Sequence, residues 1–339
     1  VAEGVLVFNG LKEQQQLQEG EVWTGSYGFK NISQKTFTDS LTVQFEIFNQ
    51  ANRMTEHRVT KIKAPEPGVT TSFFLDVETL NKSGLNDVNV FVNPRLVPEQ
   101  YYENNVLKLS GYLNVQADVF NPVLEVTVDG RYLRSGDFIS PNPEIVITLW
   151  DDNSFIKKTD TEGMKIRLTW PGATTATDIT FDRDDVVWFP QTDSERFRIV
   201  FTPENLPEGI YTLAVEARDV RNNSSGMIPY AVQFEVTYET GIVMLTPYPN
   251  PSPTDVRFDL VITGDIIPDF ARLQLVSITG TPVASFEVAQ FYIGTNRVIW
   301  NGTDDQGHEL PGGLYIYRLT VMKDGQPLMG ANGKVLLLR

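Results

Sequence analysis

The sequence predicts an all-β chain that is divided into several domains. Gly (25) and Pro (20) recur along its 339 residues, and no long stretch has the period of a helix. Strand-forming residues alternate with polar ones instead. A chain of this length exceeds what one core usually supports, and domains of about 100 to 120 residues fit it best. The predicted fold is therefore three tandem Ig-like β-sandwich domains.

Residues 1–117 form the first predicted domain. Apolar residues alternate with polar ones at 41–47, 73–77 and 88–92, which is typical of half-buried strands. Residues 88–109 resemble the last hairpin of CARDB-type adhesion modules, in which a proline-containing turn precedes a Glu and an Asn-Asn pair. We interpret four polar side chains here as capping and turn residues, namely Glu99, Glu103, Asn104 and Asn105.

Residues 118–240 form the second predicted domain, a bacterial Ig-like sandwich. Its segment 206–213, LPEGIYTL, is repeated one domain length later as LPGGLYIY at 310–317. A repeat at domain spacing indicates two tandem sandwiches and excludes a short-period solenoid. In each copy the tyrosine ring is expected to pack inward, with its hydroxyl bonded to the backbone.

Residues 241–339 form the third predicted domain, which carries five pieces in a fixed order. They are YPNP, a strand at 272–283 with a glycine turn at Gly280, a W-x-G-x-D-x-x-G hairpin, a P-x-G-x-Y strand, and a short basic-tipped closing strand. The prolines of YPNP lack donors and predict an extended entry into a domain. The motif residues are Tyr248, Pro249, Asn250, Pro251, Trp300, Gly302, Asp304, Gly307, Pro311, Gly313, Tyr315, Lys334 and Arg339.

This order of pieces resembles the C-terminal sorting domain with which proteins of Bacteroidetes-type bacteria leave the cell by the type IX secretion system. The resemblance implies an extracellular protein at the cell surface, associated with the outer membrane. It also implies that the partners are outer-membrane type IX secretion components or other surface proteins. The alternative is an ordinary Ig-like end domain, since a related FlgD-like variant occurs in flagellar-hook scaffolding proteins.

The last two thirds of the chain also resemble the region after the catalytic domain in gingipain-like C25 cysteine peptidases, a family that includes the type IX sortases. This chain has no cysteine, and its two histidines, His57 and His308, lie in other contexts. We therefore expect no enzyme in this chain and predict a non-catalytic scaffold. The resemblance allows a C25-like peptidase domain upstream of Val1, where the chain has neither an initiator Met nor a leader.

Charge and composition exclude several partners and cofactors. The formal net charge is −15, with 43 acidic and 28 basic residues, whereas binding to nucleic acid needs a basic patch. No apolar run approaches the roughly 18 residues of a transmembrane segment. The lack of cysteine removes disulfides and thiolate metal sites. No cofactor is expected, with calcium as the exception considered next.

Four oxygen-bearing side chains are candidates for a calcium site: Asp151, Asp152, Asp219 and Asn222. Their two loops are expected to approach one another at one end of the second sandwich, and Ca²⁺ takes six to eight oxygen ligands. Asp and Asn are also common turn formers, and that alternative stays open.

Two further functions remain as alternatives. A surface adhesin or carbohydrate-binding protein is one, and a free-standing enzyme is the other. The enzyme is disfavoured because no G-x-S-x-G elbow is present, and both histidines are expected at the surface. In addition, Asp39-Ser40-Leu41 matches the D-[ST]-hydrophobic pattern of O-glycosylation in this bacterial group, with Ser40 as the acceptor.

Overall fold

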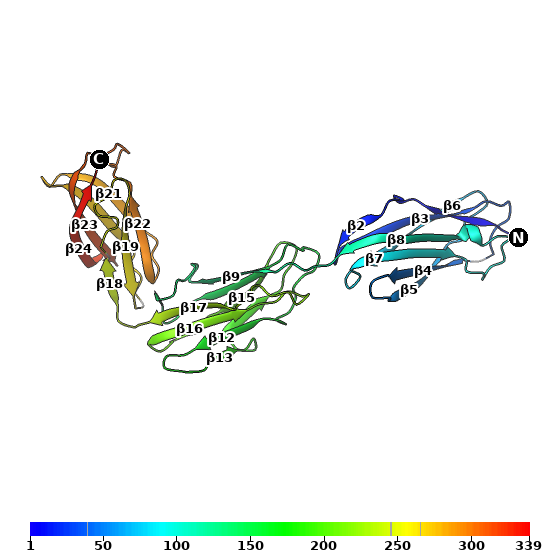
Figure 1. Cartoon of the computed structure of the whole chain (residues 1–339), viewed down its shortest axis with the longest axis horizontal. Coiled ribbons are helices and arrows are strands. Elements are labelled where there is room, and N and C mark those ends of the chain that lie inside the picture. Colours follow the sequence, from blue (N-terminus) through cyan, green and yellow to red (C-terminus); the bar gives the residue numbers. More distant parts are fainter. Residues whose placement is uncertain (39, 245, 265) are drawn as a thin grey trace. The chain divides into compact units, whose positions relative to one another are not determined.

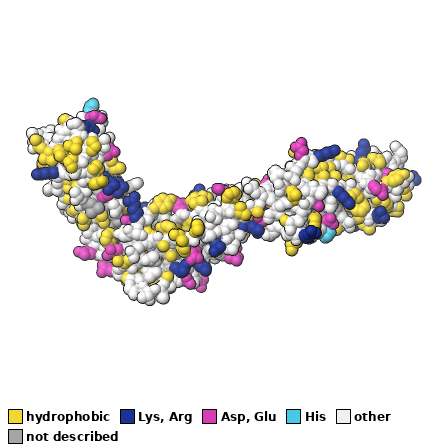
Figure 2. Space-filling model, in the orientation of Figure 1, with side chains coloured by type: hydrophobic (Ala, Val, Ile, Leu, Met, Phe, Trp, Pro, Cys, Tyr) yellow, Lys and Arg dark blue, Asp and Glu magenta, His cyan; other side chains and the backbone are white. Residues whose placement is uncertain are grey.

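The computed structural model describes residues 1–38, 40–244, 246–264 and 266–339. The described residues form six β-sheets and one short 3-10 helix, η1 (Glu103–Asn105), so the predicted all-β fold of tandem sandwiches is confirmed (Figure 1). Among them, no helix has the length and apolar character needed to cross a membrane. On the face seen in Figure 2, charged side chains of both signs lie among exposed hydrophobic ones.

The chain divides into two compact units. Unit 1 holds Val1–Asn121 together with the short segments Asp151–Lys158 and Val220–Asn223. Unit 2 holds Pro122–Trp150, Thr159–Asp219 and Ser224–Arg339.

Unit 1 contains a three-stranded sheet in the order β1-β3-β6 and a five-stranded sheet in the order β2-β8-β7-β4-β5. Strand β4 alternates buried and accessible positions, which directs Leu41, Val43, Phe45 and Ile47 into the core between the sheets. The strands are β1 (Gly4–Phe8), β2 (Gln15–Gln18), β3 (Val22–Asn31), β4 (Leu41–Asn49), β5 (Thr55–Ile62), β6 (Thr70–Glu78), β7 (Gly84–Val92) and β8 (Val106–Gln116).

Glu99 and Asn105, which the sequence suggested as turn residues, are buried in this first sandwich. One Glu99 carboxylate oxygen accepts a hydrogen bond from the Gly4 backbone N–H at 2.8 Å, and the other accepts from the Asn105 side chain at 2.8 Å. Burial raises the pKa of Glu99. The pair therefore joins the first strand to the turn before β8, as buried polar groups must find partners.

The first part of unit 2 packs a four-stranded sheet, β14-β15-β11-β9, on a five-stranded sheet, β10-β17-β16-β12-β13. Their shared core includes Phe197, Phe201, Tyr211 and Phe234. The strands are β9 (Val123–Val128), β10 (Asp137–Ile139), β11 (Ile145–Trp150), β12 (Lys165–Thr169), β13 (Thr177–Ile179), β14 (Val186–Phe189), β15 (Phe197–Phe201), β16 (Gly209–Glu216) and β17 (Tyr230–Val236).

The last sandwich packs a three-stranded sheet, β18-β19-β22, on a four-stranded sheet, β21-β20-β23-β24. Trp300, Phe258 and Leu275 are fully buried in its core. The strands are β18 (Gly241–Met244), β19 (Val256–Thr263), β20 (Phe270–Ser277), β21 (Pro282–Val288), β22 (Gly294–Trp300), β23 (Gly313–Lys323) and β24 (Gln326–Leu337).

The two copies of the internal repeat form the same local structure. The Tyr211 hydroxyl donates to the Pro207 carbonyl at 2.8 Å, and the Tyr315 hydroxyl donates to the Pro311 carbonyl at 2.7 Å. Both rings are buried, and burial raises the pKa of Tyr211 to about 12. The expected packing of each tyrosine is thus confirmed: the ring fills the core and the hydroxyl fixes the preceding turn.

The domain boundaries remain a prediction. Limited proteolysis followed by mass spectrometry would test them. The first cuts are expected within residues 117–121 and near the second predicted boundary, because turns between cores are cleaved before paired strands. The Gly and Pro residues around the predicted 240/241 boundary allow it to lie anywhere within 237–247, but β18 pairs with β19 inside this range. The second cut is therefore expected at 237–240. First cuts at Val90 or Leu213, both buried in strands, would contradict this division.

Candidate functional site around the closing strand

The motif pieces of the last sandwich gather around its closing strand, β24. This strand pairs with β23 over its whole length and buries Val335 and Leu337 on one face. Leu338, the residue after the strand, is half exposed. Three other motif pieces contact residues at the end of β24, namely YPNP, the W-x-G-x-D-x-x-G hairpin and P-x-G-x-Y.

YPNP lies alongside the end of β24 and bonds to it through a side chain. The Asn250 amide donates to the Lys334 carbonyl at 2.9 Å and accepts from the Leu336 N–H at 2.9 Å. Both X-Pro bonds, before Pro249 and before Pro251, are cis. Because proline has no N–H, the Asn250 amide takes the place of a main-chain ladder in this segment.

Ser252 continues this pairing, and sequence reasoning did not identify it. Its N–H donates to the Leu336 carbonyl at 2.9 Å, and its carbonyl accepts from the Leu338 N–H at 2.7 Å. The side chain is fully buried, with its hydroxyl bonded to the Asp255 carbonyl at 2.7 Å. A small polar residue directly after YPNP was the only sequence signal for this position.

The W-x-G-x-D-x-x-G hairpin is anchored by its tryptophan. Trp300 is fully buried, packs edge-on against Tyr315 and donates from Nε1 to the Thr303 carbonyl at 2.9 Å. Gly302 has a φ of +73°, and a Cβ there would lie 2.9 Å from the Arg339 guanidinium. The motif therefore needs glycine at this position for two reasons, the backbone conformation and the space beside Arg339.

The acidic turn of the hairpin follows the predicted turn chemistry. Asp304 accepts hydrogen bonds from the backbone N–H groups of Gln306 and His308, each at 2.8 Å. These bonds, with the His308 one contributing most, lower the pKa of Asp304. Gly307 completes the turn with a φ of +82°. His308 is exposed, as expected, with its ring beside the Asp304 carboxylate.

Arg339 ties the end of the chain to the hairpin. Its guanidinium donates to the Leu310 and Asn301 carbonyls, both at 3.2 Å, and forms an ion pair with Glu309 at 3.3 Å. Gly312 lies against the backbone of Arg339, where a Cβ would come within 2.9 Å of a carbonyl oxygen. The basic tip of the closing strand thus has a defined structural position.

Several motif side chains are accessible at this site, among them those of Tyr248 and Lys334. Lys334 is exposed, and Tyr248 is 65% exposed with Arg257 above its ring at 5.6 Å. Buried motif groups therefore fix the shape of the site, and Tyr248 and Lys334 are available to a partner.

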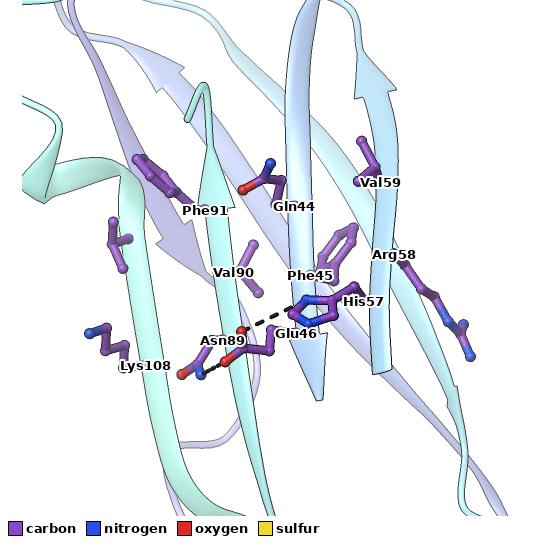
Figure 3. Close-up of a pocket in the computed structure, with 11 residues that line it drawn as sticks. Gln44, Phe45, Glu46, His57, Arg58, Val59, Asn89, Val90, Phe91 and Lys108 are labelled. Carbon is purple, nitrogen blue, oxygen red and sulfur yellow. Dashed lines mark hydrogen bonds and ion pairs between the residues drawn. The ribbon is translucent and has the colours of Figure 1, made fainter. Parts of the chain in front are cut away.

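A second candidate surface is the outer face of the β8-β7-β4-β5 sheet in unit 1, where a hollow of about 520 Å³ opens (Figure 3). The Asn89 amide donates to the Glu46 carboxylate at 2.9 Å, and the His57 ring lies 3.8 Å from the same carboxylate. Phe91 and Lys108 also line the hollow. His57 is at the surface, as predicted.

The segments that hold Asp151, Asp152 and Asn222 belong to unit 1. Both segments contact a buried acid, Glu19, that the sequence did not reveal. Glu19 is fully buried, forms an ion pair with Arg221 at 3.2 Å and accepts from the Asp118 N–H at 3.2 Å. Its carbonyl accepts from the Asn153 amide at 2.9 Å. These contacts fix segments 151–158 and 220–223.

The structure describes the position of each predicted calcium ligand. Asp151 and Asp118 offer carboxylate oxygens that lie within 4.8 Å of one another. Asp118 was not among the ligands predicted from the sequence. Asp152 is exposed beside them, and Asn222 has a φ of +68°. Asp219 is the last residue of unit 2 before the segment Val220–Asn223.

The proposed glycosylation acceptor, Ser40, is half-buried directly before β4. Asp39, the first residue of that pattern, lies outside the described residues.

Comparison with known proteins gives structural likeness only. No family model and no curated protein matches the chain. The crystal structure of dimeric latent PorU from Porphyromonas gingivalis is 16% identical over 99% of this chain and 34% of that chain, with a TM-score of 0.29. The chain therefore spans about a third of that protein's length.

Two further solved structures are similar at the same low level. The CARDB domain of the PF1109 protein from Pyrococcus furiosus, in complex with di-metal ions, is 15% identical over 34% of this chain and 88% of that chain, with a TM-score of 0.27. The FN1–FN3 domains of chicken CNTN1 are 10% identical over 99% and 98% of the two chains, with a TM-score of 0.22.

Replacing Asn250 should loosen the end of β24. Asn250→Ala removes two hydrogen bonds to the strand, and the unfolding free energy of the last sandwich should fall by about 1–3 kcal/mol. Calorimetric melting measures the change. Asn332→Ala is the matched control, an exposed asparagine on the same strand, and it should cost less than about 0.5 kcal/mol. Equal losses in both variants would show that the Asn250 amide does not hold the strand.

Calcium binding remains a prediction for the Asp151 and Asp219 loops. If it occurs, Ca²⁺ at about 100 times its dissociation constant should stabilise the folded chain by about 2.7 kcal/mol relative to chelator. Asp151→Asn should abolish this gain, whereas Asp184→Asn, a change at an exposed acid in another loop, should preserve it. Identical melting curves in chelator and in Ca²⁺ would leave these residues as turn formers.

Proposed function

We propose that this chain is a non-catalytic extracellular scaffold whose last sandwich serves as a type IX secretion C-terminal domain. The supporting observation is that YPNP, the tryptophan hairpin, P-x-G-x-Y and Arg339 converge on one closing strand, β24. The local contacts explain why the motif needs these residue types: Asn250 replaces main-chain donors, and Gly302 leaves room for Arg339. Such a rigid surface suits recognition by a fixed partner.

The proposed place of the chain is the C-terminal part of a protein like PorU or the gingipains. Its own residues include no cysteine, so the thiol nucleophile of a C25 peptidase would come from a domain upstream. In this role the tandem sandwiches space that domain from the sorting domain. They also attach it to the outside of the cell, in association with the outer membrane.

The proposed partners are outer-membrane components of the type IX system. Tyr248 and Lys334 are the groups that such a partner would contact, because both are exposed and their backbone groups are hydrogen-bonded. Tyrosine is enriched where proteins meet, since it combines an apolar ring with a hydrogen-bonding hydroxyl.

A surface adhesin or carbohydrate-binding protein is the second candidate. The hollow in Figure 3 supports it, because its lining includes the Phe91 ring together with the amide of Asn89, the carboxylate of Glu46 and the ammonium of Lys108. In such a hollow the aromatic ring can stack on a sugar, and the polar groups can form hydrogen bonds with the sugar hydroxyls. Binding of the purified chain to a glycan array, lost in Phe91→Ala, would favour this candidate.

If the last sandwich directs export, substitutions of its exposed motif residues should impair delivery to the cell surface without changing the fold. The double variant Tyr248→Ala, Lys334→Gln should retain its melting temperature but fail to reach the cell surface and accumulate in the periplasm. Surface labelling of the full protein in its native host measures this. Tyr238→Ala, Lys12→Gln is the matched control, since both side chains are exposed outside the motifs.

Deletion of residues 334–339 should block surface delivery as well. This deletion removes the buried Val335 and Leu337, so the last sandwich should also lose stability, which the double variant avoids. Normal surface display of both altered proteins would overturn the export role and leave an ordinary Ig-like end domain.

A further inference from the structure

Unit 2 contains an arginine-rich hollow of about 410 Å³. Two of its basic residues, Arg131 and Arg134, come from the segment between β9 and β10, and Arg257 and Arg297 come from β19 and β22. Four arginines around one hollow contrast with the formal charge of −15 for the whole chain. No local sequence pattern indicated this group, because Arg257 and Arg297 lie far along the chain from Arg131 and Arg134.

The carboxylates in the hollow neutralise only part of this charge. Asp137 pairs with Arg131 at 3.2 Å. Asp259 pairs with Arg297 at 2.7 Å and with Arg257 at 3.2 Å. With two carboxylates facing four guanidinium groups, two positive charges remain in excess.

Arg131 is the most buried of the four. Its side chain is only 13% exposed, it lies over the Tyr292 ring at 4.8 Å, and it donates to the Phe138 carbonyl at 2.8 Å. Gly294 makes room for it, since a Cβ there would come within 2.2 Å of the guanidinium. The Arg131 Nε is buried and has no hydrogen-bond partner among the described residues. A buried donor of this kind is normally satisfied by water or by an anion.

Arg134 differs from the others in being exposed at the rim. Its side chain forms no ion pair with any residue in the described part of the chain, although its backbone N–H donates to Asp137 at 2.9 Å. Thr295 adds a hydroxyl group to the lining, and so does the exposed Tyr132, whose hydroxyl donates to the Glu125 carboxylate. The hollow thus combines the largely buried Arg131, the exposed guanidinium of Arg134 and the Thr295 hydroxyl.

We propose that this hollow binds a doubly charged oxyanion of the phosphate class, either free phosphate or the phosphoryl group of a monoester. The planar donor fork of arginine matches phosphate oxygens. A phosphate dianion carries the charge that the two excess guanidinium groups would balance. The proposal rests on the hollow alone and is independent of the export role.

Calorimetric titration of the full chain tests the proposal. The probes are inorganic phosphate and glycerol phosphate, with chloride at matched ionic strength as the reference, at a pH above the second pKa of both probes so that each is a dianion. Saturable binding of either phosphate probe, beyond any chloride signal, is expected. Binding of both probes would mean that the phosphoryl group suffices, and binding of glycerol phosphate alone would mean that the ligand is an ester.

Two variants in the hollow and one control make the test specific. Arg134→Gln and Arg257→Gln should each weaken binding about tenfold or more, the effect of losing one charge-assisted hydrogen bond. Both side chains are accessible, and Asp259 keeps Arg297 as a partner in the second variant. Arg272→Gln removes an exposed arginine that pairs with Glu287 away from the hollow and should leave affinity unchanged.

Two results would overturn the proposal. One is the absence of phosphate binding beyond the chloride reference. The other is equal weakening by Arg272→Gln and the hollow variants, which would reduce the effect to the net charge of the chain.

Discussion

The constraint on which the structure depends is the alternation of side chains along strands that pack between two sheets. Each strand has a period of two, so a shift of one residue would turn its apolar side chains to solvent. In β24 this constraint directs Val335 and Leu337 into the core. That orientation leaves the Lys334 carbonyl and the Leu336 N–H in reach of Asn250. The local chemistry of the candidate site therefore follows from core packing.

Buried polar groups join segments of the chain that the alternating core residues do not connect. Glu99 joins the first strand to a distant turn, and Glu19 holds two loop segments by its carboxylate and its backbone. Tyr211 and Tyr315 fix the turn before a long strand through their hydroxyl groups. In each case, loss of one partner would leave a buried polar atom without a hydrogen bond, which is costly in a protein interior.

Charge is used differently at the surface. The acidic excess of the chain is spread over many separate turns, where Asp and Asn side chains cap backbone N–H groups, as Asp304 does. The arginines around Asp259 are instead gathered from segments that are distant in sequence. The first arrangement needs only local geometry, whereas the second needs the sheets to be in place. This is the physical reason that turn acids were predictable and the arginine hollow was not.

The sequence by itself determined the all-β class, the alternation that selects the core and the two matched Tyr-Pro turns, since these depend on residues that are close in the chain. It also indicated each piece of the C-terminal motif. Only the tertiary structure decided that Asn250, Trp300 and Arg339 meet at one strand end, that Ser252 belongs with them, and that Asp118 lies beside Asp151. These contacts join residues far apart in the chain, and their partners are backbone atoms or single side chains whose positions no local pattern specifies.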